Sequence, residues 1–424
     1  MEIKFSDLNK ILIFLFCFAL LQGRAYSNIT DKYNEVIEAY RADDYVTARK
    51  KGVALLPEVK ESQDLYHLTK LYYLLGYMCE YTEDFGNSII YYLEGARHGI
   101  LADDDRLTNN IISIHKNLSL LLAEYKHYDL AHRFLDEGLK FARESNNESQ
   151  TIALLNNRVF LLLDEEKFEQ AITEISELRT KYEIDASRNV ILQNKLGWAQ
   201  YSLGFYEDAL HSFYNVVEDS ASLGLEVYSI SLRNIAIIYR ERNDLTNSIE
   251  TLKKAISYNI ENNFNRWLLR SYSTIGEIYL VKQEPRVALE YFSKGMELVD
   301  HGDQNSQSYE IYKLASQAYG EFGNLEKALT LKELYATHLE EYIAQQNEIS
   351  ELGQLYNIQL LTDRYYDLLA ADMEQKRTEK LAKFGIGGTA SFFLIILSVV
   401  VYRQKRMKIT LARELHELEL HSEV

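Results

Sequence analysis

Small, apolar and aromatic residues recur along this chain with a period near 40 residues. A small residue returns at intervals of 40, 43, 40, 38, 39, 40 and 40 residues, at Ala48, Ser88, Ala131, Ala171, Ala209, Ser248, Ala288 and Ala328. An aromatic or apolar residue stands three places before most of these small residues, with Pro285 as the outlier, and a mostly small residue stands twelve places before them. Small residues at fixed offsets let two helix backbones approach closely. The pattern therefore predicts about eight stacked helix-turn-helix repeats.

Two copies show the pattern most fully: LGWAQYSLGFYEDALHSF at 196–213 and IGEIYLVKQEPRVALEYF at 275–292. In these residues the chain resembles the tetratricopeptide repeat family over roughly residues 30 to 340. The period is near 40 residues, whereas the family's usual repeat has about 34. The resemblance implies an all-α, right-handed solenoid, which we place at 28–340. From the residues that follow, we expect a long helix and then a single transmembrane helix.

The first 25 residues have the pattern of an export signal. Lys4 and Lys10 precede an uncharged apolar run over 11–21, and small residues stand before the expected cleavage site after Ala25. We therefore expect 1–25 to be a signal peptide, with an uncleaved anchor as the alternative.

A second apolar segment lies near the carboxyl terminus. Residues 384–402 form a run of 19 residues without a charge, which is long enough to span a bilayer as a helix. Four cations follow it, at Arg403, Lys405, Arg406 and Lys408, and the positive-inside rule then places 403–424 in the cytoplasm as a short basic, amphipathic tail. We expect a single-pass protein of the inner, cytoplasmic membrane, with its repeats in the periplasm or outside.

Residues 341–383, between the repeats and the predicted span, carry apolar residues at three-and-four spacing. One set is Ile349, Leu352 and Tyr356, and a second set, in a different phase, is Ile358, Leu361, Tyr365 and Leu368. A stuttered stalk is one interpretation, and it allows a homodimer through the stalk and the transmembrane helix. The other is a capping helix that folds back on the last hairpin.

The charge and the motifs of the chain exclude several function classes. The formal net charge of −17 gives an acidic exterior, which argues against nucleic acid as a partner. The sequence holds no phosphate-binding loop, no metal-spaced Cys/His cluster and no nucleophile elbow. We therefore expect no catalytic residues, no metal site and no cofactor, and we expect that the protein is not an enzyme.

A polar pattern runs through the first helices of five consecutive repeats. The residues fifteen and fourteen places before the small residue are Lys116 and Asn117, Asn156 and Asn157, Asn194 and Lys195, Arg233 and Asn234, and Ser273 and Thr274. Amides pair with a peptide backbone and cations hold carboxylates, while Trp198 and Tyr201, about one turn further on, offer apolar contact. The family resemblance adds that such first-helix positions often hold extended peptides or helices.

Two interpretations of this ladder stay open. In one, Lys116, Asn117, Asn156, Asn157, Asn194, Lys195, Trp198, Tyr201, Arg233 and Asn234 form a concave groove that binds a peptide or protein partner. In the other, one residue of each pair only caps or solvates a helix.

The order of the segments indicates a membrane-anchored adaptor or signalling protein. It resembles the exported sensor half of bacterial membrane-anchored tetratricopeptide regulators, without the output domain. The alternatives are a structural or assembly scaffold of the cell envelope, and the sensor half of a longer kinase or transcriptional regulator. In each case the expected partners are a protein or peptide and, through one span, the membrane.

Overall fold

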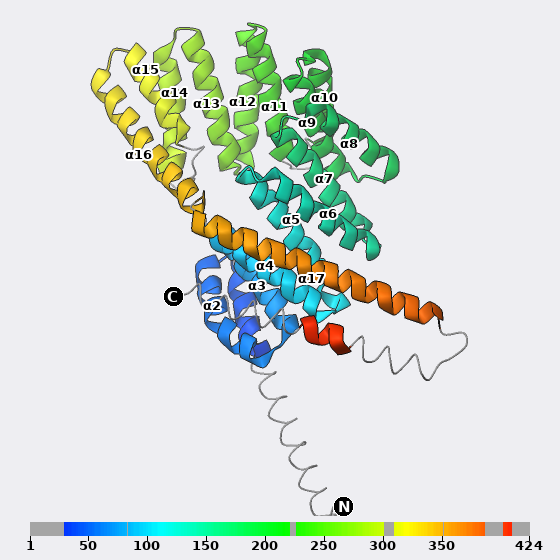
Figure 1. Ribbon diagram of the computed structural model, residues 1–424. Helices are drawn as coiled ribbons and strands as arrows, with labels where there is room; N and C mark the ends of the chain where they lie inside the picture. Colours follow the sequence, from blue (N-terminus) through cyan, green and yellow to red (C-terminus); the bar gives the residue numbers. More distant parts are fainter. Residues whose placement is uncertain are drawn as a thin grey trace, which may run out of the picture. The chain divides into compact units, whose positions relative to one another are not determined.

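The computed structural model describes residues 29–82, 84–220, 226–300, 309–350, 352–385 and 402–408. Contacts divide the chain into two compact units, which we call unit 1 (residues 1–150 and 349–424) and unit 2 (residues 151–348). The described residues outside short turns are helical, and none of them forms a strand. The helices follow one another in pairs (Figure 1), and we call the earlier member of a pair its first helix.

Unit 1 contains a helix over residues 29–41, then α2 (Tyr45–Ser62), α3 (Leu65–Tyr81), α4 (Phe85–Ala102), the short 3-10 helix η1 (Asp105–Leu107), α5 (Thr108–Glu124), α6 (Tyr128–Glu144) and α17 (Leu352–Gly385). Unit 2 is made of α7 (Glu148–Asp164), α8 (Phe168–Lys181), α9 (Ala186–Ser202), α10 (Tyr206–Ser220), α11 (Glu226–Glu241), α12 (Leu245–Glu261), α13 (Asn265–Val281), α14 (Pro285–Asp300), α15 (Glu310–Glu321) and α16 (Leu325–Ser350). Eight pairs thus occur within the described residues, one for each predicted register, and the prediction of a helical repeat fold is confirmed.

Every second helix begins at the residue three places before the small residue. The apolar or aromatic residues of that position, such as Tyr45, are the first residues of α2, α4, α6, α8, α10, α12 and α16. Pro285, the outlier of the sequence pattern, is the first residue of α14. Proline suits this place because the first helical residue needs no backbone donor and its φ is preset. The preceding residue often caps the helix: Asp44 and Asp244 accept hydrogen bonds from backbone N–H groups three residues on.

The turn inside each hairpin has one fixed backbone feature. The residue five places before the small residue has a positive φ, between 56° and 89°, in all seven hairpins whose turn is described. It is glycine only at Gly204 and Gly323, and elsewhere it is a residue such as Asp43 or Asn243. The left-handed conformation costs a side chain about 1 kcal/mol, so the hairpin geometry overrides local preference.

Within a pair, an aromatic ring of the second helix covers a glycine of the first. A Cβ added to Gly76 would lie 2.6 Å from the ring of Tyr92, and one added to Gly197 would lie 2.7 Å from the ring of Phe213. Such distances are shorter than van der Waals contact, so only glycine lets the ring lie flat against the backbone. At Ser88, Ala209 and Ala288, the glycine twelve places before the small residue therefore makes room for the aromatic residue four places after the small residue.

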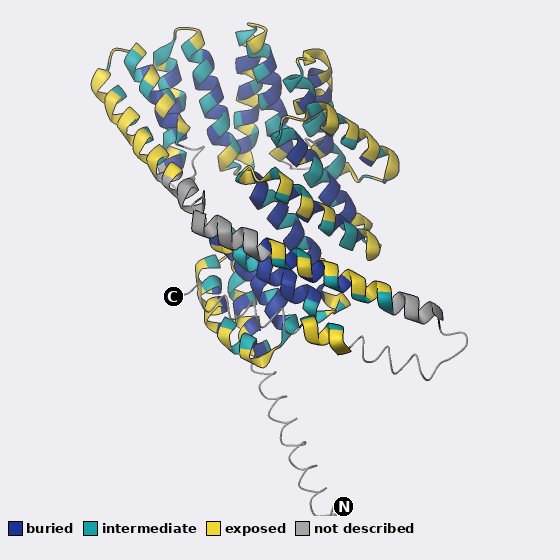
Figure 2. Ribbon diagram, viewed as in Figure 1, coloured by how far each residue is buried: buried dark blue, intermediate teal, exposed yellow. Residues whose placement is uncertain are grey.

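The recurring small residues lie at the centre of this packing. Seven of the eight are fully buried (Figure 2), and Ala328, in the last helix pair, is half-buried. Serine at this position adds a hydrogen bond: the hydroxyl of Ser88 donates to the carbonyl of Gly76 at 2.8 Å, and that of Ser248 donates to Ala236 at 2.6 Å. These bonds satisfy a buried hydroxyl without opening the helix pair.

The segment after the repeats differs from both interpretations that the sequence left open. Helix α16 continues through the expected boundary at residue 340 and ends at Ser350, and α17 then covers 352–385. The described side chains of α17 contact α4, α5 and α6 of unit 1, rather than the last hairpin. Tyr365 and Leu368, from the second apolar set, are buried in the contact of α17 with unit 1, whereas a dimeric stalk would bury them against a second copy of the helix.

The predicted membrane segments fall largely outside the described residues. The expected signal peptide at 1–25 and residues 386–401 of the expected span at 384–402 are not among them, nor is most of the tail. None of the helices in the described part of the chain combines the length and the apolar composition that a membrane span requires. Residues 402–408 form a short helix, and Lys408 Nζ lies 2.6 Å from the Asp372 carboxylate of α17. Insertion of 384–402 across a bilayer would separate these two residues and break the pair.

Candidate functional site

The predicted ladder residues of unit 2 connect neighbouring first helices. Lys195 Nζ on α9 donates to both the backbone carbonyl and the side-chain oxygen of Asn156 on α7, each at 2.8 Å. The Asn194 amide on α9 donates to the Ser231 hydroxyl on α11 at 2.7 Å. The Arg233 guanidinium on α11 donates from Nε to the Thr274 hydroxyl on α13 at 3.0 Å. The ladder is thus a row of side-chain bridges between consecutive repeats.

The two ladder residues of unit 1 have other surroundings. The Asn117 amide donates to the Tyr92 hydroxyl at 2.8 Å, and that hydroxyl in turn donates to the Glu80 carboxylate at 2.9 Å. Burial raises the pKa of Glu80, and the nearby positive charge of Lys116 opposes this shift. Lys116 and Asn117 therefore belong to a polar network of α3, α4 and α5, and they lie in a different unit from the remaining ladder residues.

Three predicted site residues are less available to a partner than expected. Asn234 is only 6% exposed, because the position fourteen places before the small residue faces the protein interior in α11. Asn157 is half-buried, and its side-chain nitrogen has no hydrogen-bond partner. Tyr201 packs on the core cluster that includes Phe213, in addition to its ring contact with Trp198 at 5.4 Å. We correct the expectation that these three side chains line an open groove.

Four of the remaining predicted residues, together with Phe160, form one face of unit 2, which we call the ladder surface: Asn156, Phe160, Lys195, Trp198 and Arg233. Phe160 is 44% exposed and Trp198 is 39% exposed. Lys195 Nζ lies 5.9 Å from the centre of the Phe160 ring. The ladder surface therefore combines two cations and an amide with two accessible aromatic rings.

Lys195 is a charged group with little solvation. Its side chain is half-buried, and burial lowers the pKa of its ammonium group to about 7. Among the described residues it forms no ion pair, and its bonds go to the uncharged Asn156. An unpaired ammonium in such surroundings is stabilised by any anion that approaches it, since the low local dielectric strengthens the attraction.

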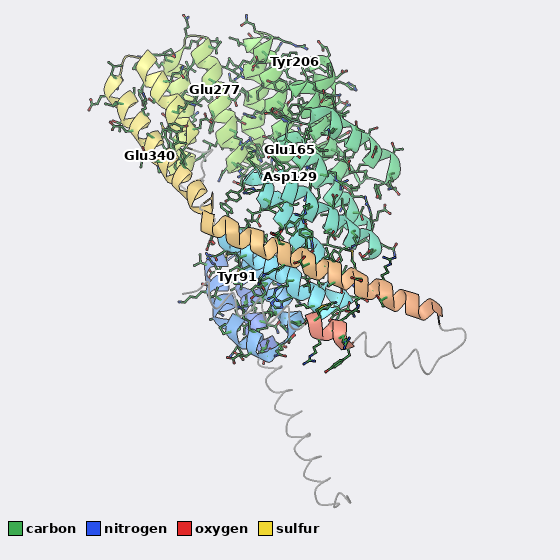
Figure 3. The ribbon with its side chains drawn as sticks, viewed as in Figure 1. Tyr91, Asp129, Glu165, Tyr206, Glu277 and Glu340 are labelled. Atoms are coloured by element: carbon green, nitrogen blue, oxygen red, sulfur yellow. The ribbon has the colours of Figure 1, made fainter. Side chains whose placement is uncertain are left out.

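Arg233 is in a similar position on the next first helix. Burial lowers its pKa to about 10, and the neighbouring charge of Arg270 acts in the same direction. Its hydrogen bond goes to the Thr274 hydroxyl, and it forms no ion pair within the part of the chain that the structure describes. The carboxylate of Glu277, labelled on α13 in Figure 3, partly offsets these charges but is bonded at 3.0 Å to Arg240.

Sequence reasoning missed Phe160, Arg240 and Glu277. The signal was present, because the positions eleven and eight places before the small residue follow the ladder by one and two turns on the same helix face. Phe160, Trp198 and Glu277 share the first of these positions, and Tyr201 and Arg240 share the second. Extending the ladder along each helix, rather than across the repeats alone, finds all three residues.

The described residues contain no group of three or more His, Cys, Asp or Glu side chains that could hold a metal ion. The helices of unit 2 thus present cations, an amide and aromatic rings on the ladder surface.

No family model matches the sequence, and no curated protein matches it. Solved structures are similar in fold. The apo form of the quorum sensor NprR from B. thuringiensis has a TM-score of 0.56 at 13% identity, over 78% of this chain and 94% of NprR. The apo form of RapI has a TM-score of 0.48 at 19% identity, over 82% of this chain and 98% of RapI.

A tetratricopeptide repeat protein from Parabacteroides merdae ATCC 43184 has a TM-score of 0.48 at 16% identity, over 67% of this chain and 99% of its own. At such identities the similarity concerns the fold, and it supports a tetratricopeptide-type helical repeat architecture.

Proposed function

We propose that unit 2 binds a peptide or protein segment that carries a carboxylate, and that the ladder surface is its binding face. The observation that carries this proposal is the pair of half-buried cations, Lys195 and Arg233, that lack an ion-pair partner among the described residues. An incoming carboxylate gains a charge-assisted hydrogen bond from each, without first displacing an intramolecular anion.

The other groups on this face suit a peptide better than a small inorganic anion. The exposed rings of Trp198 and Phe160 offer apolar area to side chains, and rings lose little conformational entropy on binding. Beside the ladder surface, the side-chain amide of Asn194, the residue before Lys195 on α9, can bond a peptide backbone if it exchanges its bond to Ser231. NprR, whose fold is similar, is a quorum sensor, and we extend a sensing role to this chain as part of the proposal.

A random-peptide display library tests this proposal. We expect the full-length protein to select peptides enriched in Asp, Glu or a free carboxyl terminus, and we expect the double variant Lys195→Gln and Arg233→Gln to lose that selection. Lys254→Gln is the matched control, because Lys254 is exposed on α12 and pairs with Glu250 on its own helix. Selection that survives in the double variant contradicts the proposal.

We further propose that residues 384–402 anchor the chain in the inner membrane, with both units outside the cytoplasm and residues 403–424 as a cytoplasmic tail. The support is the uncharged run and the four cations after it. Binding of a partner to unit 2, without catalysis, is then the event that the anchor reports inward.

The scaffold and the sensor half of a longer regulator are the alternatives to this adaptor or signalling role. Deletion of residues 409–424 separates the first from signalling, because a scaffold keeps working without its tail and a signalling protein does not. The readout is the phenotype of a strain that lacks the whole protein, complemented with either form.

A further inference from the structure

Among the described helices of unit 1, α17 is the long one that does not belong to a repeat pair, and it lies along α4 and α6 (Figure 1). Its described inward residues are spaced as on one helix face: Thr362, Tyr365, Leu369 and Asp372, with exposed fractions of 0%, 1%, 3% and 6%. The interface is thus continuous over about three helical turns.

The centre of this interface is a hydrogen bond between residues 250 positions apart. The Nδ1 atom of His115 lies 2.7 Å from the Ile111 carbonyl, so Nδ1 carries the proton and Nε2 is an acceptor. The Tyr365 hydroxyl donates to Nε2 at 2.5 Å. The Phe134 ring lies 5.7 Å from the rings of both Tyr365 and Tyr366. This cluster fixes the register of α17 on unit 1.

Around the centre, the interface buries polar atoms that gain no hydrogen bond. The Thr362 hydroxyl and the Oε2 atom of Glu137 are buried without a hydrogen-bond partner, although Lys140 Nζ lies 3.8 Å from this Glu137 oxygen. The Thr362 hydroxyl loses its water on docking and receives nothing in return, which weakens the docking equilibrium by roughly 5- to 150-fold. A repeat pair such as α3 and α4, in contrast, satisfies its buried serine.

The contacts at the edges of the α17 interface contribute little to the free energy of docking. Lys376 pairs with Asp103 at 3.5 Å, but both side chains are more than half exposed, and such pairs contribute little to stability. Lys140 Nζ lies 2.7 Å from the thioether sulfur of Met373 and 3.8 Å from the Glu137 carboxylate. A cation directed at a thioether gains less than one directed at a carboxylate.

We propose that α17 is a detachable latch, which docks on α4 and α6 through the Tyr365–His115 bond and leaves this surface while the repeats of unit 1 stay folded. The surface of α4, α5 and α6 around His115 and Phe134 is accordingly a helix-binding surface, and its occupant is the α17 segment of this same chain. The latch involves unit 1 alone, so it does not depend on peptide binding by unit 2 or on membrane insertion of 384–402.

The repeats of unit 1 keep their own core when α17 leaves. Leu71, Leu75, Met78 and Tyr92 are buried between α2, α3 and α4, in contacts that belong to the hairpins themselves. Release exposes Phe134, His115 and the α4 side chains that α17 covers, a loss that the polar atoms of the interface partly offset when they regain water.

Two residues of α17 provide a matched test in the full-length chain, with hydrogen exchange of the α17 amides between residues 362 and 378 as the readout. Tyr365→Phe removes the bond to His115, and we expect these amides to exchange at least fivefold faster. Thr362→Val removes an unsatisfied buried hydroxyl at nearly constant volume, and we expect exchange at least fivefold slower.

Amides of α3 and α4 serve as the internal reference, since the latch predicts that neither variant changes their exchange. Exchange of α17 in the unaltered chain as slow as that of α3 and α4 would make α17 an integral part of unit 1 and overturn the latch. A shift of α17 exchange in the same direction by Tyr365→Phe and Thr362→Val would overturn it as well. Circular dichroism of each variant establishes that unit 1 is folded before exchange is measured.

Discussion

The ammonium group of Lys195 donates to both the backbone carbonyl and the side-chain oxygen of Asn156, at 2.8 Å in each case. These residues are 39 positions apart, one repeat, and they lie on consecutive first helices. The contact connects α9 to α7 without neutralising the charge, because both acceptors are uncharged. The Lys195 side chain therefore bridges two repeats and is also a potential binding group.

Burial of the Lys195 ammonium group makes the stability of unit 2 depend on pH. The pKa of Lys195 is lowered to about 7 in the folded protein, while an unfolded chain has a pKa of about 10.4. The unfolded state binds more protons between these values, so the buried charge destabilises the fold fully below pH 7 and ceases to do so as the pH rises toward 10. Lys195→Met should remove this dependence.

We expect Lys195→Met to raise the free energy of unfolding at pH 7 by about 1 to 2 kcal/mol more than at pH 10, after discounting for partial solvation. Urea unfolding followed by tryptophan fluorescence measures this, because both tryptophans, Trp198 and Trp267, lie in unit 2. Lys254→Met is the control. Equal gains at the two pH values would mean that Lys195 is solvated in the folded protein.

The packing of glycines against aromatic rings predicts that two glycine-to-alanine substitutions change the free energy of unfolding in opposite directions. A Cβ at Gly276 would lie 2.3 Å from the Phe292 ring, so Gly276→Ala should destabilise unit 2 by about 1 to 3 kcal/mol. Gly320 lies in α15 with no atom within 4 Å of its added Cβ, so Gly320→Ala should stabilise it by about 0.5 to 1 kcal/mol.

Tryptophan fluorescence in urea again reports both changes. The cause of the Gly276→Ala loss is checked by adding Phe292→Leu, which removes the clashing ring atoms and should make the double variant more stable than the sum of the single variants. Strict additivity would show that the ring is not the source of the strain.

The position of Glu277 leads to a prediction about the affinity of the ladder surface for acidic ligands. Its carboxylate lies near Arg233 and is bonded to Arg240 at 3.0 Å, so it competes with an incoming carboxylate for these cations. We expect Glu277→Gln to tighten binding of an acidic peptide selected from the display library by about 3- to 10-fold, as an effect of charge.

Calorimetric titration of that peptide at two salt concentrations measures the effect, and the gain should shrink at higher salt because charges on this face are screened. Glu250→Gln, an exposed change on α12, is the control and should leave the affinity unchanged. Weaker binding by Glu277→Gln would place the ligand carboxylate away from Arg233.

The proposed anchor predicts a difference in access to the two ends of the Lys408–Asp372 ion pair. If 384–402 spans the membrane, a membrane-impermeant maleimide should label Met373→Cys in spheroplasts, whereas Met407→Cys should react only after permeabilisation. Both methionines are more than 40% exposed in the structure, so burial does not mask either site.

The span also predicts that alkaline carbonate does not extract the chain from membranes. Labelling of both cysteines in sealed spheroplasts would instead place Lys408 and Asp372 on one side, as their 2.6 Å contact has them.

The recurring small residues and their packing partners were predictable from the sequence, because each set lies within one hairpin. Gly197 and Phe213 are 16 residues apart and pack against each other within one hairpin. The small residue Ala209 lies between them in the sequence and is buried where the two helices of that hairpin pack together. The ladder was also found in sequence, but its side-chain partners were not. Whether Asn194 meets a ligand or Ser231 depends on how far one first helix is offset from the next, and the period alone does not define that offset.

The sequence by itself determined the paired helices, their turns and the small residues at their contacts, because these follow from spacing within about 40 residues. Only the tertiary structure decided that Asn234 is buried, that Lys195 is bonded to Asn156, and that α17 packs on unit 1. The sequence of an amphipathic helix indicates which face of the helix is buried, but not which other helix covers that face. For α17 the choice rests on Tyr365 meeting His115 across 250 residues, where shape and hydrogen bonding act together.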